Sequence, residues 1–156
     1  MITECFSNDG RIYLCGNGGS AADTQHIAGE LVGRFARERK AFPAVALTTD
    51  TSVITSIAND YSFDQIFTRQ IEGLMSSKDV LWVFSTSGTS KNIIAAALLA
   101  KKMGAKVLAF TGKADTELEK NADLTISIPS PTTASAQEIH QLAYHIICDL
   151  VEEKLA

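Results

Sequence analysis

The stretch Val80-Leu81-Trp82-Val83-Phe84 is continuously apolar, and the loop Ser85-Thr86-Ser87-Gly88-Thr89-Ser90 follows it at once. An uninterrupted apolar run of this length is typical of a central parallel strand that helices cover on both faces. The same succession occurs earlier, where Ile12-Tyr13-Leu14-Cys15 leads into Gly16-Asn17-Gly18-Gly19-Ser20. Both loops stand where an apolar run gives way to a helical pattern, which is typical of an α/β sheet.

Apolar runs and helical periods alternate along the rest of the chain. Further strands are expected at 44–47, 107–110 and 124–128, and helices at 53–57, 63–74, 93–102, 116–121 and 134–155. Another helix is expected to open at Ser20, with Asp23 as its capping-box partner. The alternation predicts an open five-stranded parallel sheet with helices on both faces, flavodoxin-like in size. Ligands of such sheets bind beyond the strand carboxyl ends, so the loops after strands one and three should form one site.

Composition excludes several classes of protein. The 156 residues are 46% hydrophobic with a net charge of −4, which argues against non-specific nucleic-acid binding. No apolar run approaches the roughly 20 residues of a membrane span, and residues 1–10 contain no secretory signal. Cys5, Cys15 and Cys148 are odd in number and widely spaced, so neither a disulfide framework nor a thiolate metal site is implied. A reducing, cytoplasmic compartment is expected.

The two loops point to a small phosphorylated ligand. Small residues and hydroxyls at strand ends bind phosphate through backbone N–H groups, side-chain oxygens and a helix N-terminus. A looser interpretation is a dinucleotide fingerprint, since Gly16 and Gly18 are followed by Ala21. A ribose-binding acid should follow about 20 residues on, whereas the nearest candidate, Asp50, lies about 30 residues away. No nucleotide cofactor is therefore expected, and the plain alternative is a pair of tight strand-to-helix turns.

Acid and imidazole side chains recur at helical spacing. His26 and Glu30 are four residues apart, as are Gln137, Gln141 and His145 in turn, so each set shares one helix face. Singly, each is more typical of a solvated or structural residue. Near a phosphate site, a carboxylate that removes a C–H proton beside a carbonyl and an imidazole that protonates its oxygen would generate an enediol. Imidazole and carboxylate groups also ligate divalent ions.

Four further features are weaker candidates. Arg34 and Lys91 are possible phosphate partners, although each is as well explained by a solvated charge. Asn59-Asp60 ends a helical stretch and is equally typical of a simple turn. His140 has no periodic partner, so it is expected at the surface.

Taken together, the motifs resemble the sugar isomerase (SIS) domain family, and within it the phosphoheptose isomerases. The resemblance covers nearly the whole chain, from about Arg11 to its end. It implies a single SIS domain over 1–156. It rests on Cys15-Gly16-Asn17-Gly18-Gly19-Ser20, Asp23, His26, Glu30, Gly33-Arg34, Asn59-Asp60, Ser85-Thr86-Ser87-Gly88 with Ser90, Gln137-Glu138, His140 and His145.

The resemblance implies roles for these residues. Glu30 would be the general base and His145 the general acid. The implied metal is Zn²⁺, held by His26, Glu30, Gln137 and His145. The implied substrate-binding set is Asn17, Gly18, Gly19, Ser20, Glu30, Asn59, Asp60, Ser85, Thr86, Ser87, Ser90 and Gln137.

The implied reaction converts sedoheptulose 7-phosphate to D-glycero-D-manno-heptose 7-phosphate, a precursor of bacterial lipopolysaccharide core or capsule. Members are usually cytoplasmic homotetramers with active sites at subunit interfaces. Two departures stand out. The family's helical N-terminal segment is expected to be missing or shortened, because ten residues precede Arg11, and the arginine common before the Gln-Glu pair is lacking in 132–136.

Two other functions stay open at this point. The family includes a non-enzymatic protein that regulates replication initiation by binding the initiator protein. In that protein, the positions that correspond to Glu30 and His145 do not hold the catalytic pair. Because this chain retains both residues, the enzyme is favoured. A sugar-phosphate sensor that regulates transcription ranks last, since no DNA-binding segment is evident.

Overall fold

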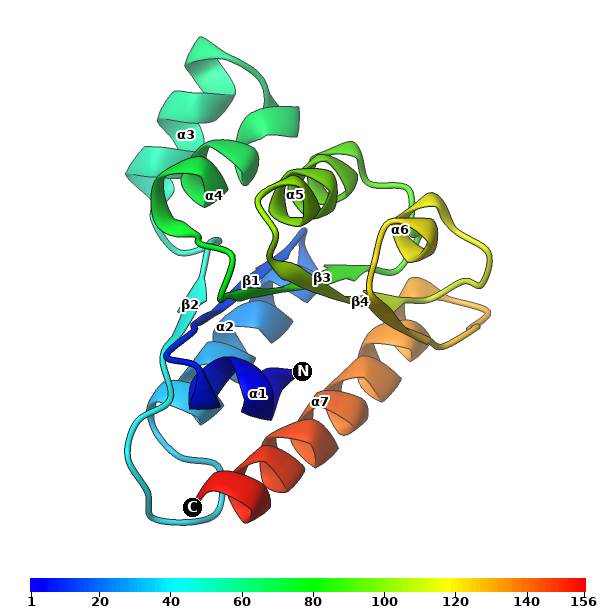
Figure 1. Ribbon diagram of the computed structural model, residues 1–156. Coiled ribbons are helices and arrows are strands. Elements are labelled where there is room, and N and C mark those ends of the chain that lie inside the picture. Colours follow the sequence, from blue (N-terminus) through cyan, green and yellow to red (C-terminus); the bar gives the residue numbers. More distant parts are fainter.

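The computed structural model describes all of residues 1–156, which alternate between strands and helices (Figure 1). The strands are β1 (Ile12–Gly16), β2 (Ala44–Ala46), β3 (Val80–Ser85), β4 (Lys106–Thr111) and β5 (Leu124–Ser127). The helices are α1 (Ile2–Ser7), α2 (Gly19–Val32), α3 (Thr51–Asp60), α4 (Thr68–Leu74), α5 (Lys91–Lys102), α6 (Glu117–Lys120) and α7 (Thr133–Leu155). All strand pairs are parallel, as expected.

Helices cover both faces of the sheet. In Figure 1, α3, α4, α5 and α6 lie above it, and α1, α2 and α7 lie below it. Two apolar cores result, because successive strand side chains point to opposite faces. Leu81 and Val83 of β3 enter one core, while Trp82 and Phe84 enter the other. Every residue of β3 is buried, which explains the continuous apolar run.

The strand order is β2-β1-β3-β4-β5, so its direction reverses between β1 and β3. These two strands pair from Ile12 with Val80 to Gly16 with Phe84. The loops that follow them therefore leave the same edge of the sheet side by side. This is the position where open α/β sheets bind ligands, and the predicted joining of the two loops is confirmed.

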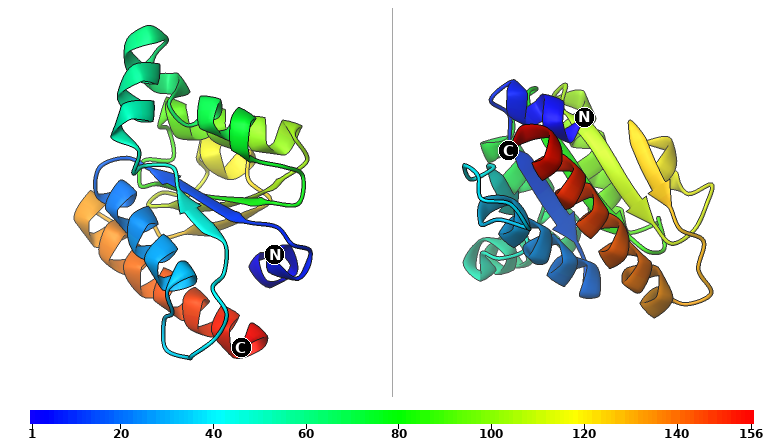
Figure 2. Two further views of the ribbon diagram at one scale, coloured as in Figure 1. Left: turned by 90° about the vertical axis from the view of Figure 1, so that its left-hand side faces the viewer. Right: turned by 90° about the horizontal axis from the view of Figure 1, so that it is seen from below.

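The helices α2 and α7 run along the same face of the sheet, beside one another (Figure 2). Both begin at the carboxyl edge, so their first turns stand next to the loop after β1. Thr132 caps α7, since its side chain accepts a hydrogen bond from the N–H of Ser135. None of the helices combines the length and the apolarity that a membrane crossing requires.

Several local expectations were wrong. The predicted helix over 63–74 is a 3-10 turn at Phe63–Gln65 followed by α4, and α1 was not expected. The capping box is absent, because α2 begins at Gly19 behind a Gly18 N-cap with φ of 57° and no side-chain cap. Ser20 is buried instead, and one carboxylate oxygen of Asp23 is buried without a partner.

The placement of His140 at the surface was also wrong. Its side chain is fully buried beside Phe84 and Phe110, and its Nε2 lies 3.2 Å from the carbonyl oxygen of Thr111. Burial lowers the pKa of His140, which favours the neutral ring. His140 therefore belongs to the core beneath α7.

Candidate active site

A pocket of about 250 Å³ lies at the carboxyl edge of the sheet, where the loops after β1 and β3 meet α7. It gathers most of the residues expected to bind substrate. Its lining consists of Asn17, Gly18, Gly19, Ser20, Phe84, Ser85, Thr86, Ser90, Thr133 and Gln137.

The loop after β3 is folded around the hydroxyl of Ser85. This hydroxyl accepts the N–H of Gly88 at 3.2 Å and lies 3.0 Å from the Ser90 hydroxyl and 3.4 Å from that of Ser87. Gly88 has φ of 66°, and a side chain there would collide with Thr116. The turn thus brings several hydroxyls to the N-terminus of α5, an arrangement suited to an anion.

An amide pair joins the two loops. Asn17 Nδ2 donates to Asn92 Oδ1 at 2.9 Å, and Asn92 Nδ2 donates back to Asn17 Oδ1 at 2.9 Å. Asn92 is 2% exposed, so this pairing satisfies a buried side chain. Sequence reasoning missed Asn92, because only the fold shows that α5 lies opposite the loop after β1.

Gln137 brings the first turn of α7 to the pocket. A side chain on Gly19 would overlap the amide of Gln137, so only glycine permits this close approach of α2 and α7. Gln137 consequently faces the turn that holds Asn17 and Gly18. The contact places an amide donor and acceptor at the pocket wall.

Farther along the two helices, His26, Glu30 and His145 form a second group. One ligand-type atom from each lies within 4.8 Å of the others. His26 Nε2 lies 2.9 Å from Glu30 Oε1 and 3.5 Å from His145 Nε2. The structure thus brings Glu30 of α2 and His145 of α7 together, although they are far apart in the sequence.

Tyr144 holds the second ring nitrogen of His26. Its hydroxyl lies 2.9 Å from His26 Nδ1. Burial, reinforced by the nearby carboxyl groups of Asp23 and Glu30, raises the pKa of Tyr144, so the phenol keeps its proton. Glu30 and Tyr144 thus contact the two ring nitrogens of His26 from opposite sides, Glu30 at Nε2 and Tyr144 at Nδ1. Sequence reasoning missed Tyr144, because an aromatic residue next to His145 in the sequence gave little reason to select it as a site residue.

Comparison with known proteins identifies the family to which this fold belongs. Residues 1–112 match the family model described as SIS domain. A phosphoheptose isomerase from a Nitratiruptor species is 49% identical over 153 residues, which cover 98% of this chain and 82% of that protein. This chain belongs to the SIS domain family, in the branch of the phosphoheptose isomerases.

Solved structures agree with this family. Phosphoheptose isomerase GmhA from Neisseria gonorrhoeae superposes on this SIS domain with a TM-score of 0.92 at 42% identity, over 97% of this chain and 81% of that one. A phosphoheptose isomerase from Francisella tularensis gives a TM-score of 0.93 at 37% identity, with the same two coverages. The fold predicted from the sequence is therefore that of solved family members.

Not every expected residue of the SIS domain lies at the pocket. Asn59 and Asp60 are exposed at the end of α3, in the layer on the other side of the sheet from α2 and α7 (Figure 1). They are bonded to one another, with Asn59 Nδ2 donating to Asp60 Oδ1 at 2.8 Å. Arg34 is also exposed and forms a 3.7 Å ion pair with Glu38. None of these three side chains lines the pocket.

Proposed function

We propose that this chain is an aldose–ketose isomerase that converts sedoheptulose 7-phosphate to D-glycero-D-manno-heptose 7-phosphate through an enediol. The observation that carries the proposal is the meeting of Glu30 and His145 beside a pocket built from two phosphate-type loops. The name phosphoheptose isomerase, which the relative from Nitratiruptor bears at 49% identity, supports the same activity. The retained acid–imidazole pair favours the enzyme over the regulator of replication initiation.

The phosphate group fits the loop after β3. The hydroxyls of Ser85, Ser87 and Ser90 converge there, and the first N–H groups of α5 have no partner within the helix. Backbone dipoles at a helix N-terminus supply local positive potential, so an acidic chain can still bind an anion. In this proposal Asn17, Gly18, Gly19, Ser20, Thr86 and Gln137 contact the sugar.

Proton transfer is assigned to Glu30 and His145. Glu30 removes a proton from C1 of the ketose while His145 protonates the oxygen on C2, which gives the enediol. Glu30 then delivers a proton to C2 while His145 takes up the proton of the C1 hydroxyl, so that the aldose forms and both groups return to their starting states. Without a bound metal, His26 Nε2 lies 2.9 Å from Glu30 Oε1 and orients its carboxylate.

The residues present also fit Zn²⁺. Two imidazoles and a carboxylate offer ligand atoms within 4.8 Å of one another, a donor set that zinc accepts. Tyr144 would hold the remaining ring nitrogen of His26, as second partners of metal-bound histidines usually do. Gln137 is the proposed fourth ligand. A bound zinc ion would polarise the carbonyl oxygen as a Lewis acid.

We also propose a homotetramer with active sites at subunit interfaces. Asn59 and Asp60 lie outside the pocket of their own chain, so they would contribute to the active site of a neighbouring subunit. One side of α7 carries an exposed apolar stripe suited to such contact, made of Ile139, Leu142, Ile146 and Leu150. Three free cysteines support a reducing cytoplasm, where the product would enter lipopolysaccharide or capsule synthesis.

The purified protein should form the aldose heptose phosphate from sedoheptulose 7-phosphate, as followed by NMR. Prior treatment with a chelator should lower kcat by at least about tenfold, because zinc-polarised carbonyls contribute several kcal/mol. Added Zn²⁺ should restore the rate, and metal analysis should find zinc bound to the untreated protein. Absence of turnover, with or without zinc, would reject the isomerase. Undiminished turnover by metal-free protein would reject the zinc site alone.

A further inference from the structure

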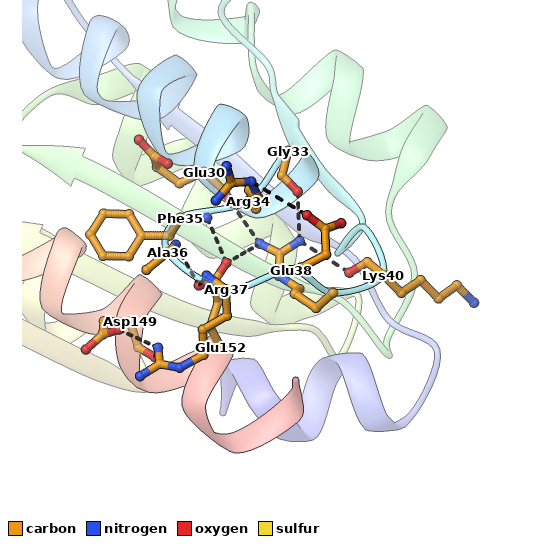
Figure 3. A network of polar contacts seen from close by, with 11 residues as sticks. Glu30, Gly33, Arg34, Phe35, Ala36, Arg37, Glu38, Lys40, Asp149 and Glu152 are labelled. Carbon is orange, nitrogen blue, oxygen red and sulfur yellow. Dashed lines mark hydrogen bonds and ion pairs between the residues drawn. The ribbon is translucent and has the colours of Figure 1, made fainter.

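The loop between α2 and β2, residues 33–43, is tied to α7 by one buried carboxylate (Figure 3). Glu152 Oε1 accepts the backbone N–H of Phe35 at 2.7 Å, and Oε2 accepts those of Ala36 and Arg37, both at 2.8 Å. The Glu152 side chain is 0% exposed. A loop without secondary structure thus acquires three fixed backbone positions.

Arg39 completes this anchor from within the same loop. Its Nη2 forms a 3.0 Å ion pair with Glu152 Oε1 and donates to the backbone oxygen of Glu30 at 2.8 Å. Its Nη1 donates to the backbone oxygen of Gly33 at 3.0 Å. These carbonyls belong to the end of α2, where helices leave oxygens without internal partners. The Arg39 guanidinium therefore caps the helix turn that carries Glu30.

The anchor keeps its charge over the working pH range. Burial raises the pKa of Glu152, but the N–H groups of Ala36, Phe35 and Arg37 together with Arg39 outweigh burial and lower it to about 2. A buried ion pair of this kind is weak support for stability as such, because apolar residues of similar volume often serve as well. The anchor is therefore better explained by the residues that it holds in place than by stability.

Both helices of the candidate active site end at this anchor. Glu152 lies seven residues, about two turns, beyond His145 on α7. The ring of Phe35, whose N–H Glu152 binds, stacks on the His145 ring with centroids 5.4 Å apart and planes 29° apart. The same network thus touches the backbone of Glu30 and the ring of His145.

We propose that Glu152 and Arg39 are positioning residues for the reaction: they fix the 33–43 loop so that Phe35 holds the His145 ring and the end of α2 holds Glu30. Neither residue touches the reacting atoms, and the kinetic part of this inference rests on the isomerase function proposed above. The chemistry of the anchor is one carboxylate that serves three backbone donors and one guanidinium.

The Glu152→Gln variant tests the proposal. It keeps the side-chain shape but sets an amide NH₂ against backbone donors, so the loop should shift. We expect kcat to fall about 10- to 100-fold with KM nearly unchanged, since small misplacements of reacting groups cost rate rather than binding. In NMR spectra, the His145 ring proton should lose the ring-current shift that Phe35 imposes.

Two more variants separate positioning from stability. Phe35→Leu leaves the backbone anchor in place and removes only the ring that stacks on His145, so it should reproduce the loss of kcat in a stably folded protein. Asp149→Asn is the matched control, because it breaks the exposed ion pair between Asp149 and Arg37 in the same loop. Its kcat should equal that of the wild type.

A folded Glu152→Gln protein with normal kcat and an unshifted His145 signal would overturn the proposal. Normal kcat in Phe35→Leu, or an equal loss of kcat in Asp149→Asn, would do the same. If the wild-type protein lacks isomerase activity, the function proposed above fails, and the His145 signal in Glu152→Gln still decides whether the anchor positions this ring.

Discussion

Replacing Glu30 with Gln is expected to lower kcat by about 1,000-fold, within the range that general acid–base groups contribute. Glutamine keeps the size of the side chain and an oxygen that can accept from His26, but it cannot remove a proton from carbon. KM should change little, because the phosphate loops are untouched. Initial rates of aldose phosphate formation, measured over a range of sedoheptulose 7-phosphate concentrations, give both constants.

The matched control is Glu153→Gln, which makes the same change at an exposed position of α7. Its kcat should equal that of the wild type, and urea unfolding should show that both variants are folded. His145→Asn should resemble Glu30→Gln, since it removes the proposed acid. A folded Glu30→Gln protein with wild-type kcat would contradict the assignment of the base.

Mixed oligomers of two inactive variants should regain activity if Asp60 serves a neighbouring subunit. Glu30→Gln lacks the base, and Asp60→Ala lacks the side chain at the end of α3. In randomly mixed symmetric oligomers, about a quarter of the sites combine an intact Glu30 with an intact Asp60 from another subunit. Co-refolding the two proteins should therefore restore about a quarter of wild-type kcat per subunit.

The control mixture combines Glu30→Gln with His145→Asn. These two side chains meet within one chain, so every subunit of that mixture lacks one of them, and no activity should return. Two results would contradict a shared site. One is wild-type activity in Asp60→Ala alone, and the other is continued inactivity of its mixture with Glu30→Gln.

The sheet and the position of the pocket were predictable because local patterns encode them. The apolar run over 80–84 is buried on both faces, and the small residues after β1 and β3 form the turns that begin α2 and α5. Parallel pairing then brings both loops to one edge, with no further information needed. His26 and Glu30 were likewise readable, since four-residue spacing on one helix fixes a shared face.

Residues whose roles depend on distant segments were not predictable. Glu152 resembles an ordinary solvated acid, and it stands near a helix C-terminus, where the helix dipole disfavours negative charge. Only the folded chain shows that three loop N–H groups and Arg39 meet it there. His140 lacks a periodic partner in sequence, yet the core beneath α7 encloses it.

Isomerisation of sedoheptulose 7-phosphate in D₂O tests the central claim most directly, namely that Glu30 and His145 move protons on one phosphosugar. A proton taken by Glu30 exchanges with solvent before it returns to carbon. The account predicts that the wild-type protein forms aldose phosphate carrying deuterium at C2, as detected by NMR or mass spectrometry. Product that forms at the full rate without any solvent deuterium would contradict the account.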